Sequence, residues 1–190
     1  MPFSATVERA LRCAVEAHAG QLRKDPQGSP YVVHPLHVAL TLVRWGANEA
    51  AVVAGLLHDV VEDCAERGWN ATRMTAEFGP HIAEVVAEVT EDKGQSWEDR
   101  KRVQLEHVPG LSADALLVKA ADLLHNMSSL GMELEDNGVD GEFWGRFSRG
   151  REGTLWFGEQ MVVALSKRVE PGIGQELARA LGRLSQAAES

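Results

Sequence analysis

Residues 48–64 read NEAAVVAGLLHDVVEDC, a stretch that combines a long apolar run with charged residues near its end. Asn48 is a residue type that commonly caps the N-terminus of a helix. The apolar residues that follow it are distributed around the whole circumference of a helix, which is typical of a helix buried at the centre of a protein. The sequence therefore predicts one central helix from Asn48 to Cys64, with charged side chains near its end.

The charged end of this predicted helix combines an imidazole with three carboxylates. Residues four apart lie beside each other on a helix, so His58 is expected to stack over Glu62, and Asp59 over Asp63. Burying such a cluster is costly unless the like charges are offset. A divalent cation would offset them, and mixed imidazole and carboxylate ligands suit manganese, iron(II) or zinc better than calcium. The alternative is a solvated helix end with chance acidic residues, which is the usual explanation of an isolated His-Asp pair.

Apolar residues recur at helical spacing on both sides of the central stretch. Ser4, Ser96 and Ser112 are candidate N-caps, and Pro35 and Pro80 can each begin a helix. The predicted helices cover residues 4–20, 35–46, 80–91, 96–108, 112–131, 155–169 and 175–184, and the last two are separated by the breaker PGIG at 171–174. No stretch indicates a β-strand. The sequence thus predicts an all-α helical bundle that forms a single domain over residues 1–190.

Composition narrows the classes of function. The chain has 190 residues, of which 44% are hydrophobic and 25% charged, as in an average globular protein. Its formal net charge of −9 argues against a nucleic acid or an anionic membrane as partner. The start MPFSATVERALRC has no positively charged segment leading into an apolar run, no stretch approaches about 20 apolar residues, and Cys13 and Cys64 form no CxxC pair. We therefore expect a cytoplasmic protein without a thiolate zinc site or a disulfide framework.

The His-Asp pair stands in a longer pattern. His34 lies in HPLHV before it, and Asp122 lies in KAADLLHN after it. This order of a histidine, a His-Asp pair and an aspartate resembles that of the HD phosphohydrolase superfamily. The resemblance implies an HD-domain helical bundle that binds a divalent metal, with Mn²⁺ expected, through four ligands: His34, His58, Asp59 and Asp122.

Four segments are similar, in this order and spacing, to the motifs of RelA/SpoT hydrolase domains, and especially to small single-domain SpoT homologues of metazoans. They are RKDPQGSPYVVHP (23–35), LLHDVVEDC (56–64), EVTEDK (88–93) followed by DRKR (99–102), and KAADLLHNM (119–127). The resemblance runs from about Ala17 to Leu130. It implies a hydrolase that removes the 3′-pyrophosphate of (p)ppGpp, leaving GDP or GTP and pyrophosphate.

The same resemblance implies roles for further residues. Glu62 and Asp63 match the acidic pair that orients or deprotonates the attacking water. An alternative for Glu62 is that it only accepts a hydrogen bond from His34 or a backbone group. Arg23, Lys24 and Asn126 match residues on the substrate side.

Other polar residues keep two interpretations. A charge run such as Arg100 to Arg102 is usually a solvated face, but the family match makes Arg100 and Lys101 candidate phosphate contacts, and Lys93 likewise. His18 lies on the apolar face of the first predicted helix, where we expect a packed, hydrogen-bonded core histidine.

Two rival functions stay open. One is the same metal chemistry on another nucleotide, such as (pp)pApp or the 2′-phosphate of NADPH. The other is a non-catalytic HD module that senses a nucleotide or a metal. The complete set of ligands together with both acids favours an enzyme.

Overall fold

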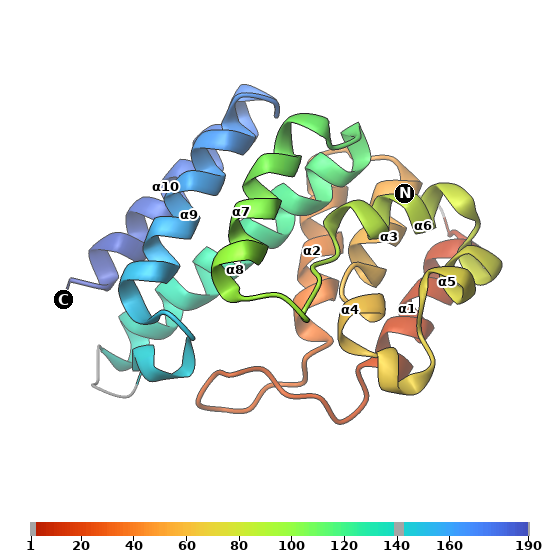
Figure 1. Cartoon of the computed structure of the whole chain (residues 1–190), viewed down its shortest axis with the longest axis horizontal. Helices are drawn as coiled ribbons and strands as arrows, with labels where there is room; N and C mark the ends of the chain where they lie inside the picture. The colour runs from red at the N-terminus through yellow and green to blue at the C-terminus, as the bar shows by residue number, and fades with distance from the viewer. Residues whose placement is uncertain (1–2, 139–142, 190) are drawn as a thin grey trace. The chain divides into compact units, whose positions relative to one another are not determined.

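The computed structural model describes residues 3–138 and 143–189, and its regular structure in these ranges is helical (Figure 1). No β-strand occurs among the described residues, where a single isolated bridge pairs Leu22 with Pro30. The prediction of an all-α protein is confirmed. None of the described helices is both long enough and apolar enough to cross a membrane. The chain divides into two compact units, Met1–Gly94 with Leu111–Asp122, and Gln95–Gly110 with Leu123–Ser190.

The first unit is built around α3, which contacts α1, α2 and α6. All seven residues from Ala51 to Leu57 on α3 are buried, so the prediction of a buried central helix is confirmed. The helices of this unit are α1 (Ala5–Ala17), α2 (Val33–Arg44), α3 (Glu49–Leu57), α4 (Val60–Asp63), α5 (Ala71–Phe78), α6 (Pro80–Val89) and the first part of α8 (Ala113–Asn137), with a short 3-10 turn η1 at Ala65–Arg67.

The predicted central helix is interrupted, which corrects the expectation of one helix from Asn48 to Cys64. α3 ends at Leu57, and α4 begins only after His58 and Asp59. The His58 ring nitrogen Nδ1 lies 2.8 Å from the carbonyl oxygen of Gly55, the acceptor that the amide of Asp59 would use in an uninterrupted helix. His58 and Glu62 therefore do not share one regular helix, although the amide of Asp63 still donates to the carbonyl of Asp59 at 2.8 Å.

Most predicted helix starts are confirmed by their caps. The side-chain oxygens of Ser4, Asn48 and Ser96 accept the backbone N–H three residues later, which satisfies a donor that the helix leaves free. One helix was missed: α5 begins after Asn70, whose side chain caps it in the same way. α8 also continues six residues past the expected end at Gly131, to Asn137.

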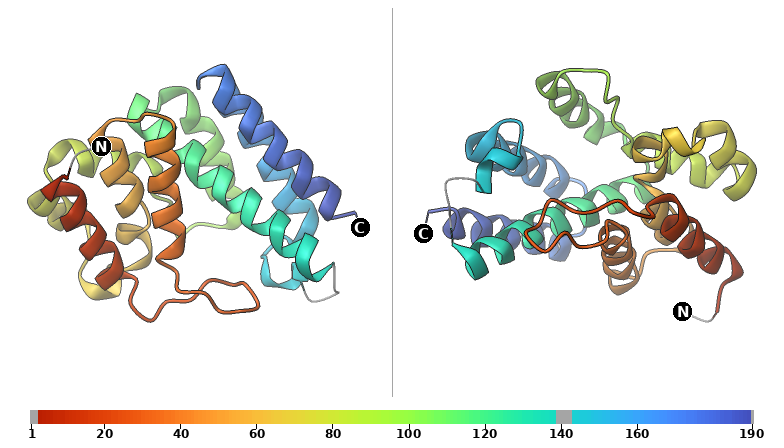
Figure 2. Two further views of the ribbon diagram at one scale, coloured as in Figure 1. Left: turned by 180° about the vertical axis from the view of Figure 1, so that it is seen from behind. Right: turned by 90° about the horizontal axis from the view of Figure 1, so that it is seen from below.

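The second unit contains α7 (Trp97–His107), the rest of α8, α9 (Gly150–Ser166) and α10 (Pro171–Ala187), with 3-10 turns η2 at Val108–Gly110 and η3 at Phe143–Arg146. α9 packs along α10 (Figure 2). The core between them includes the buried side chains of Met161, Leu165 and Leu177. The PGIG sequence forms the first turn of α10 and is not a linker, because proline is well accommodated at a helix start.

Candidate metal centre and active site

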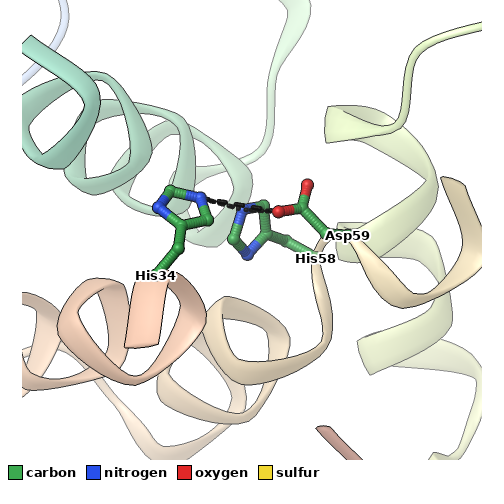
Figure 3. Close-up of side chains that lie close together, drawn as sticks. All are labelled: His34, His58 and Asp59. Atoms are coloured by element: carbon green, nitrogen blue, oxygen red, sulfur yellow. Dashed lines mark hydrogen bonds and ion pairs between the residues drawn. The ribbon is translucent and has the colours of Figure 1, made fainter. Parts of the chain in front are cut away.

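Three of the predicted ligands meet in the first unit (Figure 3). His34 comes from the first turn of α2, and His58 and Asp59 come from the turn between α3 and α4. The two Nε2 atoms are 3.1 Å apart. Asp59 Oδ2 lies 3.2 Å from Nε2 of His58 and 3.5 Å from Nε2 of His34. The three potential ligand atoms all lie within 4.8 Å of one another, so they can share one ion.

The fourth predicted ligand, Asp122, joins the cluster from α8. Its Oδ1 lies 3.3 Å from Nε2 of His34 and 4.0 Å from Nε2 of His58. Its other oxygen, Oδ2, lies 3.7 Å from the ammonium of Lys119, one turn earlier on the same helix. The resemblance to the HD superfamily had implied that segments far apart in the chain supply these four side chains, and the structure brings them together.

The donor set fits a divalent cation. His34 and His58 are 2% and 5% exposed. Nδ1 of His58 donates to the Gly55 carbonyl, so in the neutral imidazole Nε2 carries the lone pair that can bind an ion, and it lies beside the Nε2 of His34. Two imidazole nitrogens flanked by two carboxylates bind manganese, iron or zinc better than calcium. The residues present therefore form a site for a divalent metal ion.

Charge in the cluster is shared between imidazole and carboxylate. Burial disfavours the protonated form of His58, but the Asp59 and Asp122 carboxylates outweigh it and raise the pKa of His58 to about 9. Burial raises the pKa of the Asp59 carboxyl, but the neighbouring histidines outweigh this effect and hold that pKa well below the usual range. A metal ion therefore competes with a proton for this site.

The acidic pair Glu62 and Asp63 lies on α4, immediately after the cluster. Glu62 Oε2 accepts the backbone N–H of Glu91 at 2.9 Å. The ammonium of Lys93 pairs with Asp63 and lies 3.5 Å from Oε1 of Glu62. Burial raises the pKa of Glu62, and the negative charge of Asp59 raises it further. The hydrogen bond from the Glu91 amide lowers it, but not enough to reverse the shift. The backbone contact matches the alternative stated for Glu62, whose other oxygen, Oε1, faces the ammonium of Lys93.

The predicted substrate residues fall into two groups. Arg23 and Lys24 lie on the loop between α1 and α2, in the same unit as the metal cluster. Arg100 and Lys101 on α7, and Asn126 on α8, belong to the second unit. Their role in substrate binding stays a prediction.

His18 is buried at 2% exposure, and its Nδ1 lies 2.7 Å from the side-chain oxygen of Gln21, which matches the expected packed core histidine. Tyr31, by contrast, was missed in the sequence. Its hydroxyl donates to Oδ2 of Asp59 at 2.7 Å. Burial and the Asp59 charge raise the pKa of Tyr31, so the phenol keeps its proton. The only signal in the sequence is its position three residues before His34.

An HD domain family matches residues 10–141 of the chain. The MESH1 guanosine-3′,5′-bis(diphosphate) 3′-pyrophosphohydrolase of Xenopus tropicalis is 42% identical over 131 residues, covering 67% of this chain and 70% of that protein. The human MESH1 protein of the same description is 40% identical over 129 residues, with the same coverage. The GTP pyrophosphokinase rsh of Brucella suis is 39% identical over 140 residues, which make up 70% of this chain and 18% of that longer protein.

Solved structures agree with these sequence matches. A structure described as a metazoan ortholog of SpoT that hydrolyzes ppGpp and plays a role in starvation responses has a TM-score of 0.80 and 31% identity, covering 95% of this chain and 96% of that one. A protein from Listeria monocytogenes EGD-e has a TM-score of 0.68 and 34% identity, covering 78% of this chain and 96% of that one.

Proposed function

The chain belongs to the HD-domain family that contains the MESH1 pyrophosphohydrolases, and from this premise we propose that it is a metal-dependent (p)ppGpp 3′-pyrophosphohydrolase. The observation that carries the proposal is the meeting of His34, His58, Asp59 and Asp122 beside two acidic side chains. Manganese is the proposed ion, because the mixed nitrogen and oxygen ligands suit it. The cytoplasm is the proposed location.

The proposed reaction consumes one water molecule. Water attacks the phosphorus attached to the ribose 3′-oxygen, the bond between them breaks, and the 3′-oxygen takes up a proton. The products are GDP or GTP and pyrophosphate. A divalent cation, when bound, supplies Lewis acidity that stabilises charge on the phosphate oxygens and acidifies water.

The side chains around the ion divide the remaining work. We assign to Glu62 and Asp63 the task of accepting or steering the proton of the attacking water. The buried position of Glu62 raises its pKa, which makes it a stronger base than an exposed glutamate. The ammonium of Lys93 offsets one of the two negative charges of this pair, and a substrate phosphate could take the place of a carboxylate against it. Arg23 and Lys24 supply local positive charge to a chain of net charge −9.

A substrate panel tests the function. With manganese, we expect the purified protein to release pyrophosphate from ppGpp and pppGpp faster than from ppApp or pppApp, and to release little orthophosphate from NADPH. A chelator should stop turnover and added manganese should restore it. A faster reaction on adenine nucleotides or NADPH would redirect the proposal to that substrate. Binding of all these nucleotides without turnover would support the sensing module instead.

Replacing Arg23 and Lys24 together by Ala should weaken substrate binding but leave manganese binding intact. A hydrogen bond to a charged group contributes about 1.5–3 kcal/mol, so the loss of even one contact should raise KM about 10- to 100-fold. Calorimetry with chelator-treated protein would measure nucleotide affinity without turnover. Arg12→Ala is the matched control, because Arg12 pairs with Glu8 on the exposed face of α1. Unchanged nucleotide affinity in the double variant would show that these two residues do not contact the substrate.

A further inference from the structure

Tyr31 contacts one of the ligand oxygens of the metal cluster. Its hydroxyl donates to Asp59 Oδ2 at 2.7 Å, and this same oxygen is the one that lies 3.2 Å from Nε2 of His58. A carboxylate oxygen has two lone pairs. If one accepts the Tyr31 hydroxyl, the other is available to an ion between the histidines. The hydrogen bond thereby fixes the rotation of the Asp59 carboxylate.

The Tyr31 ring is itself held in place by two imidazoles. Its centroid lies 4.9 Å from that of His18 in a tilted arrangement, and 5.9 Å from that of His34 in an edge arrangement at 68°. The carbonyl of Tyr31 also accepts the backbone N–H of His34 at 2.9 Å. Tyr31 therefore touches two of the four proposed ligands, one through its hydroxyl and one through its backbone and ring.

Gln21 connects Tyr31 to Asp63, which follows the metal cluster in the chain. Its carbonyl accepts the backbone N–H of Tyr31 at 2.9 Å, and its side-chain nitrogen donates to the carbonyl of Asp63 at 3.1 Å. Arg23 follows two residues later, with its N–H bonded to the carbonyl of Ser29 at 2.8 Å. The segment that carries the basic pair is thus anchored to the chain that carries Asp59 and Asp63.

From these contacts we propose that Tyr31 is a positioning residue for the metal centre, which orients Asp59 Oδ2 toward the ion and fixes the entry of His34 into α2. The proposal deepens the proposed function and rests on it for the identity of the reaction. Partners that orient metal ligands typically contribute 10- to 100-fold to metal affinity. Tyr31 does not need to touch the substrate to have this effect.

Tyr31→Phe removes the hydroxyl and keeps the ring. We expect its manganese affinity, measured by calorimetry without nucleotide, to fall about 10- to 100-fold. The melting temperature of the metal-free protein should stay close to wild type, and saturating manganese should restore most of kcat. Thr75→Val is a matched control that removes a hydroxyl bonded to a backbone carbonyl on α5. Its manganese affinity should not change. A Tyr31→Phe affinity within twofold of wild type would overturn the proposal.

Tyr31 is the single tyrosine of the chain, which allows a direct observation. In protein made with tyrosine labelled at the ring Cζ carbon, one NMR signal reports on this hydroxyl. We expect it to shift on titration with diamagnetic zinc, because the ion withdraws charge from the Asp59 oxygen that accepts the hydrogen bond. An unmoved signal with zinc bound would also overturn the proposal. The manganese affinity and the NMR signal are both measured without a substrate, so a failure of the proposed activity leaves these two tests intact.

Discussion

Replacing Asp59 by Ala is expected to abolish both tight manganese binding and pyrophosphate release. Asp59 Oδ2 lies within 3.5 Å of both histidine Nε2 atoms, so its removal leaves two imidazoles and the single carboxylate of Asp122, which is 4.0 Å from Nε2 of His58. Such a set holds a divalent ion weakly, and turnover should fall to background. The fold should survive, because the Asp59 side chain lies at the site and fills no part of the apolar core.

Three measurements on one preparation check this result: bound manganese, pyrophosphate release and the far-ultraviolet circular dichroism spectrum. Asp136→Ala is the matched control, since Asp136 is exposed near the end of α8. It should retain metal and activity. An Asp59→Ala variant that binds manganese tightly and turns over normally would contradict the assignment of Asp59 as a metal ligand.

Replacing Glu62 by Gln is expected to lower kcat about 100- to 10,000-fold, the usual contribution of a general acid or base. Gln keeps the size of the side chain and an oxygen that can accept the Glu91 N–H, but it lacks the basicity to take a proton. Manganese stoichiometry should stay near wild type, because Glu62 lies outside the ligand cluster. Asp63→Asn should give a similar or milder loss if the pair shares the task.

Measuring kcat, bound manganese and melting temperature together separates the two interpretations of Glu62. If it serves only as an acceptor for Glu91, Gln should leave all three near wild type, and Ala should lower the melting temperature. Near-normal turnover in Glu62→Gln would refute the catalytic role, whatever the melting temperature does.

Local signals predicted much of the fold. Ser4, Asn48 and Ser96 could be recognised as caps because each bonds to an amide only three residues away. The break after Leu57 could not be predicted, since the apolar pattern continues through Val60 and the cause is a side-chain bond from His58 to the backbone. α5 was missed because it is only eight residues long and buries two side chains, Met74 and Phe78, so its apolar pattern extends over too few turns to be recognised.

Part of the candidate site was likewise predicted from the sequence, and part was not. The order of His34, the His-Asp pair and Asp122 pointed to the cluster, because a family motif records which distant segments meet. It carried no information on which oxygen of Asp59 faces the histidines. The motif also did not predict the ion pair of Lys93 with the acidic pair or the hydrogen bond from Tyr31 to Asp59. These contacts depend on how loops fold back onto α4.

The most direct test of the central claim is the identity of the products. The manganese-loaded protein should convert ppGpp to equal amounts of GDP and pyrophosphate. Phosphorus NMR and nucleotide chromatography on the same sample measure both products. The reaction should stop when the metal is chelated. Release of orthophosphate in place of pyrophosphate, or unchanged ppGpp in the presence of protein with bound manganese, would contradict the assignment of a 3′-pyrophosphohydrolase.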